Sequence, residues 1–130
     1  MRKSKSLEKP RFAYDGLNRV IHERARLSLM TSLITHAAGL LFSDLKELCA
    51  LTDGNLNRHL AVLEEAKLIS VVKTSNGTRC RITALGRKRY VEYLAVLDQV
   101  ISDAADALNT SEEAADGLRL SILLEGQKGS

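Results

Sequence analysis

Aromatic residues are scarce in this sequence: its 130 residues include three Tyr, two Phe and no Trp. Proteins that bind single-stranded nucleic acids stack the bases on exposed aromatic side chains, so this composition disfavours that class. A protein that binds duplex DNA needs no such platform. The hydrophobic fraction of 45% is nevertheless high enough for the buried core of one folded domain.

Cysteine and long apolar stretches are also lacking. Only Cys49 and Cys80 are present, and no signal peptide is recognisable at the start of the sequence, which favours free thiols in a reducing cytoplasm. The longest apolar stretch is far too short to cross a bilayer. We therefore expect a cytoplasmic protein that has no membrane partner.

Motifs for catalysis and for metal binding are missing as well. The sequence has no glycine-rich phosphate-binding loop, no Gly-x-Ser-x-Gly motif and no pair of carboxylates with a reason to share a cleft. A metal site needs three or four converging ligands, whereas His22, His36 and His59 are scattered along the chain. We expect neither enzymatic activity nor a bound cofactor or metal.

What the chain does have is an uneven distribution of charge. Residues 1–89 contain 17 of the 19 Lys and Arg residues and 8 of the 16 Asp and Glu residues, for a net charge of +9. Residues 90–130 contain the other 2 basic and 8 acidic residues, for a net charge of −6. A basic body followed by an acidic segment is typical of a polyanion-binding surface joined to a separate assembly element.

Apolar residues at helical spacing predict three helices in the first half of the chain. The first covers residues 23–37. The second is a short helix over residues 44–48, with Ser43 as its N-cap. The third covers residues 53–67, with Thr52 as its N-cap.

The pattern then changes from helical periodicity to alternation. Residues 69–74 and 78–83 are predicted to form two strands. Asn76-Gly77 between them is typical of the two central residues of a type I′ turn. The sequence therefore predicts a β-hairpin directly after the third helix.

Two further helices are predicted after the hairpin. Thr83 can cap a long helix from Ala84 to about Leu108, and Ser111 can begin another that ends near Leu124. The long helix carries apolar residues at alternating spacings of four and three, the pattern of a seam between two helices. We predict that this seam pairs two copies of the chain. Its residues are Tyr90, Leu94, Leu97, Ile101, Ala104 and Leu108.

The third predicted helix begins with polar side chains that suit the major groove of duplex DNA, although an ordinary solvated helix face is the alternative. The groove accepts one helix, whose exposed N-terminal residues reach the base edges. Asparagine can pair with adenine, and arginine can pair with guanine or bind a phosphate. Glycine lets the backbone approach a phosphate, and histidine can donate to one, more strongly when protonated. The candidates are Ser43, Thr52, Asp53, Gly54, Asn55, Asn57, Arg58 and His59.

The predicted hairpin offers a second contact with DNA. Basic and small polar residues surround its turn, and such a hairpin can lie along phosphates or enter the minor groove. An edge hairpin kept soluble by its cations is the alternative. The candidates are Lys73, Thr74, Asn76, Gly77, Arg79 and Arg81.

The two thiols have different predicted roles. Cys80 lies between Arg79 and Arg81, whose charges could lower the pKa of its thiol, so that Cys80 is a candidate redox sensor. Cys49 lies between apolar positions of the second helix and is predicted to be a buried packing residue.

The region from Leu17 to about Ile101 resembles the winged helix transcriptional regulators of the MarR/ArsR-like superfamily, especially the short winged helix DNA-binding domain proteins of bacteria and archaea. The matching segments are RVIHERARL (19–27), FSDLKEL (42–48), LTDGNLNRHL (51–60) and ITALGR (82–87), of which the third is the most specific. The resemblance implies a homodimeric transcription factor whose helix beginning at Thr52 reads DNA and whose terminal helices pair. The metal-sensing branch typically has two nearby thiolates in the helix before the turn, where this chain has only Cys49.

The predicted fold class is therefore mainly α with a small β-hairpin (α+β), as a winged helix-turn-helix with an appended long C-terminal dimerisation helix. Residues 1–14 are expected to form a basic, mobile arm, and residues 15–83 the DNA-binding domain. Residues 84–125 are expected to form the helical dimerisation region, and residues 126–130 a frayed tail.

These observations predict a sequence-specific regulator that binds double-stranded DNA as a homodimer, with the recognition helix in the major groove and the wing on the backbone or in the minor groove. A pocket between the core and the dimer helices could bind an unknown small-molecule effector, but no convergent polar set identifies one. The alternative is a winged helix that serves as a protein–protein adaptor without DNA. An adaptor would expose an apolar patch on the reading face and would have little use for a basic hairpin.

Overall fold

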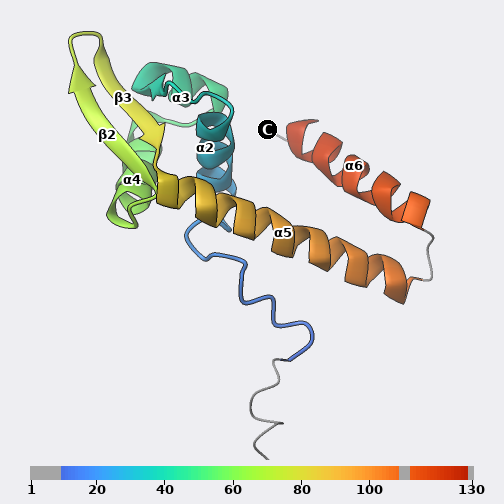
Figure 1. Cartoon of the computed structure of the whole chain (residues 1–130). Helices are drawn as coiled ribbons and strands as arrows, with labels where there is room; N and C mark the ends of the chain where they lie inside the picture. Colours follow the sequence, from blue (N-terminus) through green and yellow to red (C-terminus); the bar gives the residue numbers. More distant parts are fainter. Residues whose placement is uncertain (1–9, 109–111, 129–130) are drawn as a thin grey trace, which may run out of the picture.

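The computed structural model describes the backbone of residues 10–108 and 112–128, and side chains for residues 10–108 and 116–124. Three helices pack together at one end of the molecule, and a β-hairpin projects from them (Figure 1). A long helix leads away from this unit, and a last helix turns back along it. The elements are α2 (Arg24–Ile34), β1 (Leu40–Leu41), α3 (Phe42–Leu48), α4 (Asp53–Glu65), β2 (Ile69–Thr74), β3 (Gly77–Ile82), α5 (Ala84–Ala107) and α6 (Glu112–Lys128). This is the predicted α+β fold class.

The hydrophobic core lies where α2, α4, the sheet and the first half of α5 meet. Burying each large apolar side chain contributes about 1.5–3 kcal/mol, so this cluster is the main source of stability. The side chains with less than 2% exposure are Tyr93, Ile21, Leu29, Met30, Leu33, Leu45, Leu56, Leu63 and Cys80.

The sheet is antiparallel, with strand order β1-β3-β2. The long pair is the predicted hairpin. Strand β1 was not predicted, because its two residues are too few to show alternation; Leu40 pairs with Cys80 and Leu41 with Arg79. Through this pairing β3 connects the hairpin to the start of α3.

The hairpin turn lies one residue earlier than predicted. Strands β2 and β3 pair as far as Thr74 and Gly77, so Ser75 and Asn76 are the central residues. A type I′ turn requires positive φ at both central residues. Neither Ser75 nor Asn76 has a positive φ, whereas Gly77, which follows them, has a φ of 118°. The Thr74 hydroxyl donates to the Gly77 carbonyl at 2.7 Å and accepts from the Asn76 amide at 3.2 Å. The predicted Asn76-Gly77 type I′ turn is therefore wrong in both position and type.

The start of α5 is fixed as predicted. The Thr83 hydroxyl accepts from the Gly86 amide at 2.9 Å and donates to the Lys67 carbonyl at 2.7 Å. A Cβ atom at Gly86 would overlap the Leu68 carbonyl oxygen. Only glycine therefore lets α5 pack so closely on the chain between α4 and β2, and this contact sets the direction of α5.

The end of α2 and the start of α3 differ from the prediction. Helix α2 ends at Ile34 rather than at residue 37. Helix α3 begins at Phe42 with Leu41 as its N-cap, so Ser43 lies inside the first turn and the predicted cap is wrong. The Asp44 carboxylate accepts from the Leu41 amide at 3.3 Å, which satisfies this helix end without a capping hydroxyl.

The C-terminal helix is longer than predicted. Helix α6 runs from Glu112 to Lys128, so most of the predicted tail at residues 126–130 belongs to it. The predicted cap Ser111 lies outside the described residues, as do residues 1–9 of the predicted arm.

Candidate nucleic-acid interface

The N-terminus of α4 is capped and tied to α3. The Thr52 hydroxyl accepts from the Asn55 amide at 3.2 Å, as the sequence predicted. Asp53 lies in the first turn, where the helix dipole favours a carboxylate, and its Oδ1 is 2.9 Å from Nζ of Lys46 in α3. One helix therefore braces the first turn of the next, which is the arrangement that a helix-turn-helix needs.

The exposed side of this helix end is polar. Asn55, Asn57 and Arg58 are all exposed, and Arg58 Nη2 donates to Asn55 Oδ1 at 3.2 Å. This bond between residues one turn apart orients the guanidinium, which keeps further N–H donors for a base or a phosphate. A Cβ atom at Gly54 would meet nothing within 4 Å. Packing therefore does not require glycine there, and the backbone is open to a close approach from outside.

Ser43 does not have the capping role that was predicted. Its side chain is exposed in the first turn of α3 rather than serving as the cap. It remains available to an external partner.

His59 is not part of the exposed face on which the sequence analysis placed it. Its side chain is 5% exposed, because it follows Leu56 by three residues and shares the buried side of α4. Burial lowers the pKa of the imidazole, Arg58 and Arg26 lower it further, and Glu23 opposes them. The lowered pKa favours the neutral ring, and the predicted exposed position of His59 is wrong, while its predicted contact with phosphate stays a prediction.

The partners of His59 were missed by the sequence analysis. Arg26 Nη1 lies 3.1 Å from His59 Nδ1, and Arg26 Nε donates to the Val20 carbonyl at 2.6 Å. Glu23 caps α2 by accepting from the Arg26 amide at 2.8 Å. Glutamate is not a preferred N-cap residue, and the amide it binds is a backbone group, so the residue types do not indicate this cap. Nothing in the sequence pairs Glu23 or Arg26 with α4.

The predicted basic cluster of the wing is divided between two faces. The register places Val72 opposite Arg79 and Lys73 opposite Thr78, and directly opposed residues share a face. Lys73 therefore lies on one face near the tip, and Arg79 on the other. Thr74, Asn76 and Gly77 at the tip are exposed, as predicted.

The two arginines of β3 lie over the loop before β1. Arg79 Nη1 donates to the Gly39 carbonyl at 3.3 Å, and Arg79 is only partly exposed. Arg81 is exposed, but its Cγ lies 2.6 Å from where a Gly39 Cβ would be. Of the predicted wing cations, Lys73 alone lies near the tip.

Neither thiol has the character of a redox sensor. Cys80 is fully buried, and burial, followed by the charge of Glu64, raises the pKa of its thiol to about 11. The neighbouring arginines lie on the opposite face of β3, so they do not offset burial. The redox role predicted for Cys80 is therefore wrong. Cys49 is partly buried, with its sulfur 3.5 Å from Ser32 Oγ, and burial raises its thiol pKa as well.

The predicted seam on α5 has two different environments. Tyr90 is 7% exposed in the core, where its hydroxyl lies 2.8 Å from Thr31 Oγ1, so it cannot contribute to a seam between chains. The residues that follow it along the predicted seam face α6 of the same chain. Leu94, Leu97 and Ile101 line a cavity of about 160 Å³ together with Ile122 and Leu123 of that helix. Ala104 and Leu108 are exposed.

A polar anchor holds α6 against α5. Arg119 of α6 contacts Asp98 of α5 and donates to Ser102 Oγ at 2.7 Å. Beyond this contact α6 exposes several large apolar side chains. Their exposed fractions are 58% for Leu120, 49% for Ile122, 66% for Leu123 and 49% for Leu124.

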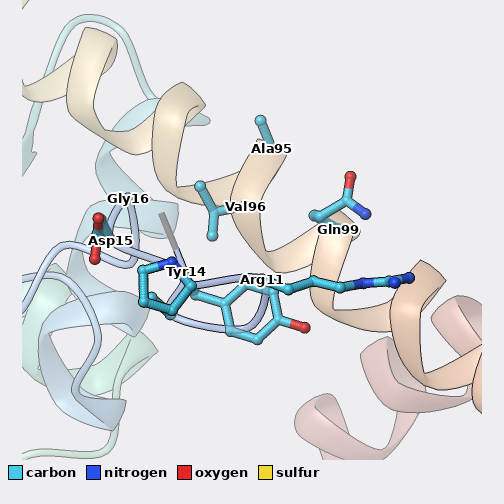
Figure 2. Close-up of a pocket in the computed structure, with 9 residues that line it drawn as sticks. Arg11, Tyr14, Asp15, Gly16, Ala95, Val96 and Gln99 are labelled. Atoms are coloured by element: carbon cyan, nitrogen blue, oxygen red, sulfur yellow. The ribbon is translucent and has the colours of Figure 1, made fainter. Parts of the chain in front are cut away.

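The segment before α2 lies along α5. Tyr14 extends along the side of α5 that carries Val96 and Gln99 (Figure 2), and its hydroxyl donates to Asp103 Oδ2 at 2.7 Å. A cavity of about 510 Å³ is lined by this segment and by α5. Pro10 to Tyr14, which belong to the predicted arm, are therefore placed against the long helix.

No helix in the described part of the chain has the length and apolar character to span a bilayer. The same residues contain no group of three or more His, Cys, Asp or Glu side chains arranged to hold a metal ion.

Comparison with known proteins agrees with this geometry. Residues 25–101 match the model of the family described as the winged helix DNA-binding domain. The chain belongs to this family. The match covers the three packed helices, the hairpin and most of α5, so it includes the whole candidate interface. A search of curated protein sequences found no significant match.

Solved structures show the same fold. A transcriptional regulator homologue from Pyrococcus horikoshii has a TM-score of 0.62 and 26% identity, with 80% of this chain and 98% of that chain covered. A MarR-family transcriptional regulator from Silicibacter pomeroyi has a TM-score of 0.55 and 17% identity, covering 86% and 80%. The heme sensor PefR from Streptococcus agalactiae, solved with heme, has a TM-score of 0.61 and 14% identity, covering 96% and 84%. The family is that of a winged helix DNA-binding domain, and the fold is shared with a transcriptional regulator homologue.

Proposed function

We propose that this transcriptional regulator binds specific sequences of double-stranded DNA as a homodimer. The observation that carries the proposal is the exposed N-terminal half of α4, where Asn55 and Arg58 are hydrogen-bonded to each other and Asp53 is braced by Lys46. An apolar patch on this face would have favoured the adaptor, and none of the exposed residues in positions 52–58 is apolar.

In the proposed complex, α4 enters the major groove. Asn55 and Arg58 contact base edges, and the remaining N–H groups of Arg58 reach the adjacent backbone, while the open backbone at Gly54 approaches a phosphate. Ser43, Thr52 and Asn57 surround these contacts. The wing tip carries Lys73 to the backbone or into the adjacent minor groove. Arg79 and Arg81 add positive charge farther from the tip.

The dimer is proposed to form through the α5–α6 hairpin rather than through α5 alone. Leu94, Leu97 and Ile101 already pack toward α6 in the same chain. Helix α6 leaves several large apolar side chains exposed, and such exposure is typical of an interface. On this proposal residues 15–83 bind DNA and residues 84–128 assemble the dimer, which acts in the cytoplasm.

A small-molecule effector is a further part of the proposal. The heme sensor of the same fold was solved with its ligand. In the present chain the cavity of about 510 Å³ between the Pro10–Gly16 segment and α5 has the size of a ligand pocket. It lies beside the proposed assembly helices, so a bound molecule could bias how they pair.

The test is selection of binding sites from a random duplex library by the full-length protein, followed by footprinting of the selected site. We expect a pseudo-palindrome with half-sites about 10 bp apart, because two α4 helices must reach successive major grooves on one side of the duplex. Selection of no sequence would contradict specific binding. Selection of a single half-site would contradict the dimer.

A further inference from the structure

His59 of α4 lies between two arginines, Arg26 of α2 and Arg58 of α4. Its Nδ1 is 3.1 Å from Arg26 Nη1, and its Nε2 is 3.4 Å from Arg58 Nη2. A guanidinium has N–H donors only and no acceptor. A neutral imidazole has one acceptor nitrogen and one N–H. Both contacts therefore cannot be hydrogen bonds at the same time.

The geometry selects which nitrogen accepts. Arg26 is held in place by its bond to the Val20 carbonyl, and its contact with the ring is the shorter one. We therefore assign Nδ1 as the acceptor and place the proton on Nε2. Arg58 cannot donate to that N–H and instead donates to Asn55. The Nε2–H is left facing another donor, with no acceptor between them.

His59 also lines a cavity. A cavity of about 300 Å³ between the start of α2, the turn after α3 and the exposed side of α4 is lined by His59, Arg58, Asn55, Arg24 and Glu23, among others. Glu23 is the one carboxylate in this lining. It caps α2, and its nearer carboxylate oxygen is 3.7 Å from Nδ1 on the inner side of the ring. Two arginines, Arg24 and Arg58, therefore outnumber the single carboxylate in this lining.

We propose that His59 Nε2–H and the Arg58 guanidinium together bind a phosphodiester oxygen of the DNA backbone in this cavity. This inference rests on the proposed function, because the ligand is the duplex itself. It makes His59 a neutral, buried donor to phosphate, with Arg26 holding the ring in the required tautomer. The oxygen supplies the acceptor that the two adjacent donors lack.

Two conservative variants test the roles of the two ring nitrogens separately. In His59→Gln the amide nitrogen takes the place of Nε2, so the donor to phosphate is kept. In His59→Asn the amide oxygen takes the place of Nδ1, so the acceptor for Arg26 is kept and the outer donor is lost. Thermal denaturation of both variants identifies any general loss of folding.

The measurement is the affinity of full-length protein for several duplexes of different sequence at pH 7.5 and a series of salt concentrations. We expect His59→Gln to bind within about threefold of wild type and His59→Asn to bind about tenfold more weakly on every sequence. Because the lost donor is neutral, the slope of log affinity against log salt should not change, whereas Arg58→Ala should reduce its magnitude by about 0.9 per contact. The opposite order, with His59→Asn normal and His59→Gln weak, would overturn the inference and leave a structural role.

A second measurement uses the wild-type protein and needs no variant to fold. Nitrogen-15 NMR of the histidine rings should show the Nε2–H tautomer for His59, and its Nε2–H signal should shift when duplex DNA is added. An Nδ1–H tautomer, or a signal unaffected by bound DNA, would refute the contact. If wild-type protein does not bind duplex DNA at all, the proposed function fails, whereas binding with an unaffected His59 ring defeats only this inference.

Discussion

The exposed start of α4 and the pair of helices α5 and α6 expose opposite kinds of side chain. At the start of α4 the exposed residues are polar or cationic, with Asn55 and Arg58 bonded to each other. On α6 the exposed residues include Leu120 at 58% and Leu123 at 66%. The first surface suits a polyanion and the second an apolar partner. On the proposed function, DNA contact and assembly are carried by separate parts of the chain, so a substitution at the start of α4 should leave the dimer intact.

The largest expected effect is on assembly. Leu120→Glu places a charge on the exposed apolar surface of α6 and should weaken the dimer at least about 100-fold, because a carboxylate is costly to bury in an interface. Sedimentation over a range of protein concentrations measures this. Ser121→Glu adds the same charge at the next residue and serves as the control. If the Leu120 variant remains a dimer at the dissociation constant of wild type, α6 is not the interface.

The next effect is on base recognition. Arg58→Ala should cost about 1–3 kcal/mol at a site with guanine at the contacted position, and the preference for guanine there should be relaxed. Competition binding with single-base variants of the selected site measures it. Arg87→Ala removes the same charge from the exposed start of α5 and should cost less. An equal loss for Arg58→Ala on all sequences would restrict Arg58 to phosphate.

Smaller effects are expected at Gly54, where a substitution should increase stability but weaken DNA binding. Alanine there should raise the free energy of unfolding by about 0.5–1 kcal/mol, because the helix gains propensity and the new Cβ meets nothing within 4 Å. The same methyl group should weaken DNA binding by holding a phosphate away from the backbone. Chemical denaturation and duplex titration of one preparation measure both. A variant that is more stable and binds DNA normally would exclude the close approach.

The smallest expected effect is that of modifying the Cys80 thiol on DNA affinity. With its pKa raised to about 11 by burial, the Cys80 thiol has on the order of one thiolate in a thousand or fewer at pH 7.5. Alkylation of native protein should therefore be slow, speed up sharply on unfolding, and rise with pH only toward that pKa. Peroxide treatment should leave DNA affinity unchanged in both wild type and Cys80→Ser. A loss of affinity in wild type alone would restore the redox role.

Local patterns were enough to predict most of the elements. Thr52 and Thr83 cap α4 and α5 as their side chains indicate, and both long strands were expected from alternation. The turn between the strands was misplaced, because Asn76-Gly77 satisfies the common hairpin rule while the native register instead places Gly77 after the central residues.

The errors in the candidate site are of two kinds. Local periodicity would have avoided two of them, because His59 follows Leu56 by three residues on the buried side of α4, and strand alternation places Arg79 and Arg81 on the face opposite Cys80. The contacts of His59 with Arg26 and of Tyr90 with Thr31 come from α2, which is distant in sequence. Long-range packing of this kind cannot be inferred from one sequence without contacts.

The most direct test of the central claim is a titration of fluorescent duplex DNA with the full-length protein at several salt concentrations, with sedimentation to count protomers per duplex. If each protomer neutralises about three to five phosphates, log affinity should fall with log salt with a slope of about −5 to −9 for two protomers on one duplex. Binding that is independent of salt, or a monomer that ignores DNA even at low salt, would contradict the account and favour a protein–protein adaptor.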